Sequence, residues 1–149
     1  MVGDESRGFI PNLSRSDQDS LMVLPASMRL RGHRCFNRLH RSSKRQHGSL
    51  MVLRVASGDS KLLRRELRGV REQSCRCALV ISSKVSKRAV KRNRLRRLLH
   101  DHLRQRLERR NDLAGRWLLI SLRPEAAEAE PTQLLEECDS LLRSAGLDP

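Results

Sequence analysis

The sequence predicts an α+β protein, a two-layer sandwich of helices on a sheet, formed by a chain of 149 residues. Three β-favouring runs, at residues 49–57, 75–82 and 116–123, supply the strands. A long amphipathic helical pattern separates the last two runs, and a second helical pattern closes the chain. A hydrophobic content of 38% suffices for one modest core, so we expect a single domain.

The first 27 residues, MVGDESRGFIPNLSRSDQDSLMVLPAS, are rich in Ser, Asp, Gly and Pro and show no sustained hydrophobic period. This composition predicts a disordered lead, which a gene-model extension would also explain, because Met22 and Met28 are both credible alternative starts. We therefore place the folded domain at residues 28–149.

The next segments predict a helix and two strands. GHRCFNRLHRS, residues 32–42, spaces Cys35, Phe36 and Leu39 as a short amphipathic helix would. SLMVLRVAS, residues 49–57, predicts a strand that ends at a Ser-Gly-Asp turn. KLLRRELRGVREQS, residues 61–74, fits either a charged helical turn or a distorted strand. CRCALVIS, residues 75–82, predicts a buried strand.

The segment KVSKRAVKRNRLRRLLH, residues 84–100, continues to about residue 110 as one predicted helix. Ser82, Ser83 and Ser86 are suited to cap its start. Two faces then follow from helical spacing. The apolar face holds Leu95, Leu98, Leu99, Leu103 and Leu107, and the polar face holds Arg94, Arg97, Asp101 and Arg104.

RWLLISLR, residues 116–123, predicts another buried strand, and TQLLEECDSLLRSAG, residues 132–146, a terminal helix. Thr132 can cap the start of that helix and Gly146 its end. The order is α-β-β-β-α-β-α if the uncertain segment is a strand. A right-handed crossover is the default for the strand, helix, strand unit if its strands are parallel.

A formal charge of +14 favours a polyanionic partner, because such a surface repels itself in the free protein. Nucleic acid is the first candidate. A membrane surface is a poor one, since the chain has one Trp, two Phe and no Tyr to anchor it. No apolar run has the length of a transmembrane helix, and the N-terminus lacks a signal-peptide pattern, so we expect a cytoplasmic protein.

The four cysteines, Cys35, Cys75, Cys77 and Cys138, form no regular framework, and we expect reduced thiols without a disulfide. Cys75 and Cys77, with His33 or His40, could be interpreted as a zinc site. The two cysteines are separated by one residue, fewer than zinc sites usually have between ligands, which favours the interpretation that they are small core or edge residues of the sheet.

The segment 84–110 concentrates twelve Lys or Arg against two acids. A solvated helix face would explain an ordinary charge run. Here like charges at i,i+3 and i,i+4 repel one another and disfavour the isolated helix, and almost no acidic residues offset this repulsion. Phosphate binding is therefore the favoured interpretation. Arg offers planar forks for phosphate, and Asn93 can contact a sugar or a base edge.

The residues from Lys84 to Arg97, with Arg92-Asn93-Arg94 at their centre, resemble the signature of the bacterial ribonuclease P protein subunit. RLRGHRCFNRLHR resembles that family's N-terminal helix, and RCALVIS its strand before the motif. GRWLLISLRP, with the helix that follows it, resembles the C-terminal part of the family. The resemblance covers residues 28–147.

The resemblance implies a left-handed βαβ crossover, as in the second domain of ribosomal protein S5. It also implies a protein that partners ribonuclease P RNA and precursor tRNA, where the RNA and its Mg²⁺ remove the 5′ leader endonucleolytically and the protein has no catalytic residue or metal of its own. Two sets of residues carry over. The first, for the catalytic RNA, is Lys84, Arg88, Lys91, Arg92, Asn93, Arg94, Arg96 and Arg97. The second, for the 5′ leader, is Phe36, His40 and Arg54.

His40 and Arg54 stand where the family often has aromatic residues, so less stacking area is offered to the leader. An ordinary core role is the alternative for Phe36, and a solvated helix position for His100. Trp117, in a buried-looking strand, is expected in the core.

The alternative function is another basic RNA-binding protein, of ribosomal or RNA-chaperone type. An independent nuclease would need clustered carboxylates or a His with an acid partner, and Asp101 beside His100 and His102 is the only candidate. A DNA binder is disfavoured, because no recognition-helix pair is visible.

Overall fold

The structure is a computed structural model that describes residues 24–63, 65–67 and 74–147. Its helices are α2 (His33–Ser42), α3 (Ala89–Leu107) and α4 (Pro131–Ser144), and its strands are β1 (Lys44–His47), β2 (Met51–Ser57), β3 (Arg76–Val80) and β4 (Arg116–Leu122). The order α-β-β-β-α-β-α is confirmed. None of the helices in the described part of the chain has the length and apolar character needed to span a bilayer.

The four strands form one sheet in the order β1-β2-β4-β3. β2 pairs antiparallel with β1 and β4, whereas β3 pairs parallel with β4. Met51, Leu53 and Val55 on β2 are buried and alternate with more exposed residues, as expected for a strand with one well-covered face. β4 is central, and Trp117 to Ile120 are all buried, because both of its faces are covered.

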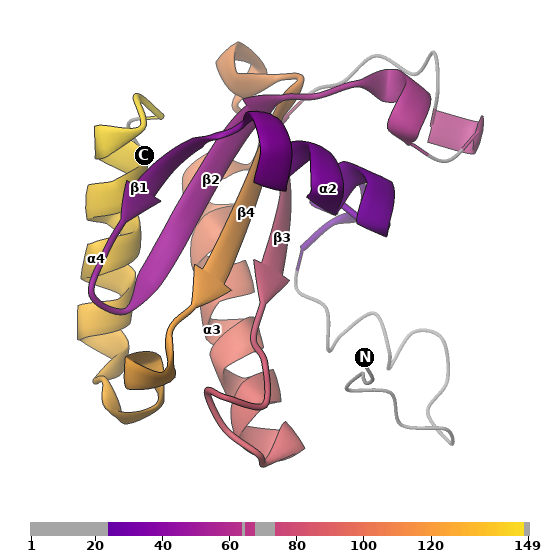
Figure 1. The fold of residues 1–149 in the computed structure, drawn as a ribbon. Helices are drawn as coiled ribbons and strands as arrows, with labels where there is room; N and C mark the ends of the chain where they lie inside the picture. The colour runs from indigo at the N-terminus through magenta and orange to yellow at the C-terminus, as the bar shows by residue number, and fades with distance from the viewer. Residues whose placement is uncertain (1–23, 64, 68–73, 148–149) are drawn as a thin grey trace.

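Helices α3 and α4 cover one face of the sheet, and α2 covers part of the other (Figure 1). The larger core cluster lies under α3 and α4 and includes Leu53, Leu99, Leu118 and Leu142. A smaller cluster lies under α2, where Cys35 and Leu39 of α2 meet Trp117 and Leu119 of β4. The core position expected for Trp117 is confirmed, since it is 2% exposed.

The β3-α3-β4 connection is left-handed. In Figure 1 the arrows of β3 and β4 both point downward, β4 lies to the left of β3, and α3 passes behind the sheet. The right-handed default is therefore wrong, and the crossover implied by the resemblance is the one observed. On this face the leucine side of α3 packs into the same core cluster as α4.

The sequence pattern allowed an additional strand at residues 61–74, but the additional strand of the structure lies elsewhere. It is β1, whose residues KRQH carry no β-favouring signal and are mostly exposed. Within 61–74, the described residues contribute only to single turns of 3₁₀ helix, at Ser60–Leu62 and Arg65–Leu67. β1 forms instead because a tight connection at residues 48–50 returns the chain onto β2.

Two helix starts differ from prediction. α3 has Arg88 at its N-cap, two residues after the last of the three serines suited to cap it. The Ser86 hydroxyl accepts a hydrogen bond from the Arg88 amide at 3.2 Å. α4 is capped not by Thr132 but by Glu130, which forms a reciprocal capping box with Gln133. Arg88 and Glu130 both have an extended backbone, and each helix begins at the residue that follows.

Gly146 ends α4 as predicted. It has a φ of +81°, and the Leu147 amide donates to the Leu142 carbonyl at 2.9 Å, which is the bonding pattern of a Schellman motif. At the other end of the chain, Leu24 is 1% exposed and belongs to the larger core cluster, four residues ahead of the expected domain start. The rest of the lead, residues 1–23, lies outside the described residues.

Candidate nucleic-acid interface

Helix α3 is anchored to the core by one row of leucines. Leu95, Leu99, Leu103 and Leu107 are at most 8% exposed, and each buried leucine contributes roughly 1.5–3 kcal/mol of hydrophobic stabilisation. Val85, 5% exposed, anchors the loop that leads into the helix. This anchoring holds the basic first turns of α3 in place despite their mutual repulsion.

The predicted catalytic-RNA residues divide into two groups. Arg94 and Arg97 are exposed on the outer side of α3, and Lys84 and Arg88 are exposed in the loop before it. These side chains can meet a phosphate without moving the core. Lys91 and Asn93 are half-buried. The Lys91 ammonium lies 3.9 Å from Glu128 Oε1, an exposed ion pair that contributes little to stability.

Arg92 and Arg96 share the helix side of Leu99 and Leu103, and both are half-buried. Arg92 Nη1 donates to the Ser86 carbonyl at 2.7 Å, so its guanidinium is held against the preceding loop. Arg96 Nη1 donates to Asn93 Oδ1 at 3.2 Å. Internal hydrogen bonds thus position the Arg-Asn-Arg segment before any ligand is bound.

The predicted leader residues lie together where α2 covers the sheet. Phe36 is half-buried against the smaller core cluster, and His40 follows one turn later on α2. Arg54, on β2, lies opposite Arg45 of β1 in the strand register. Sequence analysis missed Arg45 because it missed β1.

These side chains form a site of concentrated positive charge. Burial lowers the pKa of His40, and so do the nearby charges of Arg54 and Arg45. Burial and Arg45 likewise lower the pKa of Arg54, whose Nε has no hydrogen-bond partner in the described part of the molecule. Like charges on directly opposed strand positions are destabilising, and a bound polyanion relieves that cost.

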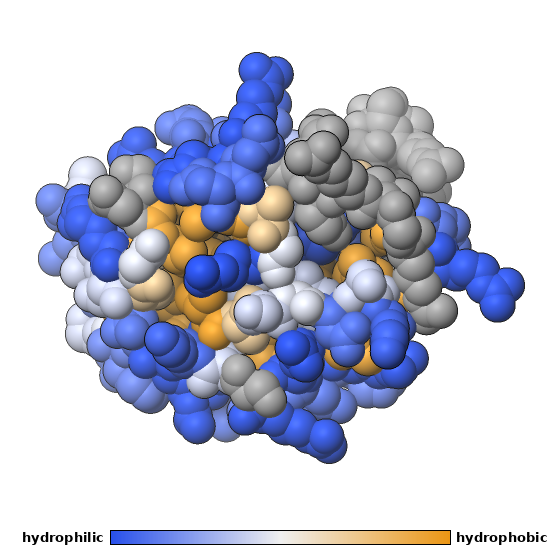
Figure 2. Space-filling view, turned by 90° about the horizontal axis from the view of Figure 1, so that it is seen from above, coloured by the Kyte–Doolittle hydropathy of each residue, from blue (hydrophilic) through white to orange (hydrophobic). Residues whose placement is uncertain are grey.

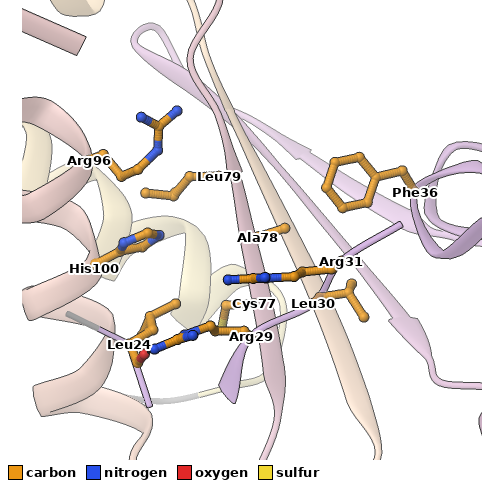
Figure 3. Close-up of a pocket in the computed structure, with 10 residues that line it drawn as sticks. All are labelled: Leu24, Arg29, Leu30, Arg31, Phe36, Cys77, Ala78, Leu79, Arg96 and His100. Atoms are coloured by element: carbon orange, nitrogen blue, oxygen red, sulfur yellow. Dashed lines mark hydrogen bonds between the residues drawn. The ribbon is translucent and has the colours of Figure 1, made fainter. Parts of the chain in front are cut away.

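A pocket of about 110 Å³ lies between these two surfaces and was not foreseen from the sequence (Figure 3). Arg96 and His100 enter it from α3, Arg29 and Arg31 from the segment before α2, and Phe36 from α2. His100 is 4% exposed, so the solvated position considered for it is wrong. It lies where α3 crosses the edge of β3, and a single sequence carries no signal for that contact.

The remaining titratable groups are arranged for structure. His102 pairs with Asp139 and not with Asp101, which accepts a hydrogen bond from Gln105 instead. Cys75 and Cys77 are buried free thiols with their Sγ atoms 4.0 Å apart. Within the described ranges, no group of three or more His, Cys, Asp or Glu side chains is placed to hold a metal ion.

The face in Figure 2 is rimmed by charged side chains. Hydrophilic side chains project around its edge and surround apolar areas near its centre. Among the described residues, Val90 is the one large hydrophobic side chain that is clearly exposed, at 68%, and it lies in the first turn of α3. Such a surface suits a polyanion better than an apolar protein partner.

Comparison with known sequences identifies close relatives. The Ribonuclease P family profile matches residues 24–146. The ribonuclease P protein component of Synechococcus sp. strain CC9902 is 76% identical over 127 residues, which cover 85% of this chain and 99% of the relative. That of Parasynechococcus marenigrum strain WH8102 is 77% identical over 126 residues, covering 85% and 98%.

Solved structures share the fold. The ribonuclease P protein of Staphylococcus aureus aligns with a TM-score of 0.65 at 14% identity, over 82% of this chain and 98% of that one. The Thermotoga maritima protein, in complex with 1-(4-fluorophenyl)-2-thiourea, aligns with a TM-score of 0.60 at 19% identity, over 77% and 97%.

Proposed function

Because the chain belongs to the ribonuclease P protein family, we propose that it acts as the non-catalytic protein subunit, which binds the RNA that itself performs the hydrolysis. The protein is a component of ribonuclease P, a ribonucleoprotein enzyme of tRNA processing. The proposal adds a division of labour. In it the protein holds RNA in position, and the ribonuclease P RNA removes the 5′ leader of precursor tRNA.

One observation carries this proposal: the first turns of α3 present a dense basic surface on a helix that is fixed from behind. Arg94 and Arg97 point outward, while Arg92 and Arg96 are held by internal hydrogen bonds. Preorganised guanidinium groups lose less side-chain freedom on binding phosphate, and each can make two parallel hydrogen bonds. We assign this surface to the ribonuclease P RNA.

The site under α2 is assigned to the single-stranded leader. Single strands are bound by a positive groove together with planar groups on which bases stack. Phe36 and His40 supply ring faces, and Arg54 supplies charge and a planar guanidinium. The leader would thus leave the catalytic RNA at α3 and pass over the sheet beside α2.

Hydrolysis, in this proposal, uses Mg²⁺ ions bound by the RNA, with the protein's positive surface compensating part of the phosphate charge around them. The particle would work in the cytoplasm, without membrane or DNA as a partner. The alternative of a ribosomal or chaperone-type RNA-binding protein is not favoured, because the family match spans nearly the whole described chain.

The experiment is precursor-tRNA cleavage at low magnesium, with ribonuclease P RNA alone, protein alone, and both together. We expect cleavage to be stimulated only in the mixture. Tight RNA binding without stimulation would replace the proposal with another RNA-binding role, and cleavage by the protein alone would overturn the division of labour.

A further inference from the structure

The pocket at the edge of β3 combines positive charge with an apolar floor. Arg29 and Arg31 extend toward α3 from the segment before α2, and Arg96 and His100 lie opposite them (Figure 3). Leu24, Leu30 and Leu79 add apolar surface to the lining. The pocket is partly open to solvent, and its volume of about 110 Å³ exceeds what a single water molecule needs several times over.

The cationic side chains are fixed in place from behind. Arg29 Nε donates to the Leu24 carbonyl at 2.8 Å. The Leu30 amide donates to the Cys77 carbonyl at 3.0 Å, so this segment runs along the edge of β3. Arg76, 3% exposed, adds hydrogen bonds to the carbonyls of Ala26 and Arg29 at 3.2 and 3.0 Å. The segment is thus bound to the sheet, and its arginines are held beside α3.

His100 has a hydrogen-bonding atom in the pocket that no described residue satisfies. Burial lowers its pKa to about 4, and the charges of Arg96 and Arg29 act in the same direction. The imidazole is therefore neutral near pH 7, and its Nδ1 is buried without a hydrogen-bond partner among the described residues. An unpaired buried polar atom is destabilising, and this one lies near the positive charges of Arg96 and Arg29.

We propose that this pocket is a phosphate site, in which Arg29, Arg96 and His100 bind one backbone phosphate of single-stranded RNA. The proposal rests on the function proposed above and adds a subsite to it. A phosphate beside His100 would offset the positive charges of Arg29 and Arg96 on either side and give the ring nitrogen of His100 a partner. Leu24, Leu30 and Leu79 would contact the attached ribose.

The position of the pocket explains why it would matter. It lies between the α3 surface, to which Arg96 also belongs, and Phe36 at the site under α2. A nucleotide held there would fix the path of RNA from one surface to the other. The phosphate could come from the ribonuclease P RNA or from the leader, and binding assays with each RNA separate the two sources.

The direct probe is a single-stranded RNA tetranucleotide added to the full chain, followed through the ring resonances of His100. We expect those resonances to move and the pKa of His100 to rise from about 4 to about 5 or higher, because a phosphate favours the charged imidazolium. Unmoved His100 resonances while the amides of Arg94 and Arg97 respond would overturn the proposal.

A second measurement compares Arg29→Ala with Arg143→Ala, a charge-matched change at an exposed position of α4. Arg29→Ala should remove one phosphate contact. The slope of log affinity against log salt should then flatten by roughly 0.7–0.9, and the affinity should fall about tenfold. Both changes should be seen with the RNA that supplies the phosphate, either the ribonuclease P RNA or precursor tRNA with its leader. Arg143→Ala should leave both unchanged. Equal behaviour of the two variants would count against the site.

Arg29→Ala also removes the hydrogen bond from Arg29 to the Leu24 carbonyl, which holds the segment before α2. The melting temperature of this variant is therefore measured together with its RNA affinity. If it unfolds, His100→Gln decides the matter through tetranucleotide affinity, which should fall while the salt slope stays unchanged, because the imidazole is neutral near pH 7. Unchanged tetranucleotide affinity would count against the site. The proposed function is judged separately, because stimulation of cleavage by the unaltered protein does not depend on these variants.

Discussion

His102 Nε2 lies 2.7 Å from Asp139 Oδ1, and this contact joins α3 to α4 behind the sheet. His102 is 6% exposed, and Arg106 adds hydrogen bonds to both oxygens of the same carboxylate at 3.3 and 3.4 Å. Burial alone would raise the pKa of the Asp139 carboxyl, but hydrogen bonds from His102 and Arg106 lower it below its usual value. The carboxylate therefore stabilises the helix pair in its charged form.

Replacing Asp139 by Ala should destabilise the protein by about 1–3 kcal/mol, because it leaves the buried ring nitrogen of His102 without a partner. Urea unfolding at pH 7 measures the change. Asp101→Ala is the control, since this exposed carboxylate on α3 contacts Gln105. A loss no larger than that of the control would mean that leucine packing alone holds the two helices together.

The connection between β1 and β2 depends on Glu137 of α4. Its carboxylate accepts hydrogen bonds from the amides of Ser49 and Leu50 at 3.1 and 2.8 Å, and from the Ser49 hydroxyl at 2.8 Å. Glu137→Ala should cost roughly 1–2 kcal/mol and speed amide exchange in β1. Glu136→Ala, on an exposed neighbour, should do neither. Unchanged exchange in β1 would show that the hairpin forms without α4.

The stability of the protein should fall as the pH is lowered from about 6.5 to 4, because the pKa of His100 is about 4 in the fold and 6.5 otherwise. Between these values the unfolded chain binds more protons than the folded one, so unfolding is favoured on acidification, by roughly 2–3 kcal/mol over the whole window. His40, whose pKa is also lowered, acts in the same direction.

His100→Gln should remove most of this slope, and urea unfolding at pH 4.5 and 7 compares the two proteins. If the variant loses as much stability as the unaltered protein over that range, the buried neutral imidazole is not the group that titrates.

Much of the fold could be predicted because its signals are local. The leucine spacing of α3 and the β-favouring runs of β2, β3 and β4 each fall within one element. β1 could not be predicted, since KRQH is shaped by its pairing with β2 and by Glu137, which follows it by about ninety residues. The concentration of basic residues on α3 is local in the same way, and its role in binding RNA stays a prediction.

The pocket could not be predicted from the sequence, because Arg29 and His100 lie far apart in the chain. They come to line one pocket because both the segment before α2 and helix α3 lie beside β3. His100 illustrates the difficulty. By helical spacing it borders the leucine side of α3. In the fold it lines the same pocket as Arg29, which lies in the segment that pairs along the edge of β3, and it is 4% exposed.

Phe36→Ala should reduce affinity for precursor tRNA with a leader of several nucleotides by roughly 5- to 150-fold, which corresponds to about 1–3 kcal/mol for stacking on one base. Mature tRNA, which has no leader, should bind as before. Because Phe36 also packs against the smaller core cluster, its melting temperature is measured in parallel. Equal losses for precursor and mature tRNA would assign the side chain to the core alone.

The most direct test of the account measures how the affinity for ribonuclease P RNA depends on salt. The double variant Arg94→Ala with Arg97→Ala removes two exposed guanidinium groups from α3, and Arg116→Ala with Arg143→Ala removes two exposed ones elsewhere. The first pair should flatten the slope of log affinity against log salt by roughly 1.4–1.8, and the second should leave it unchanged. An unchanged slope for the α3 pair would contradict the assignment of this helix to the RNA.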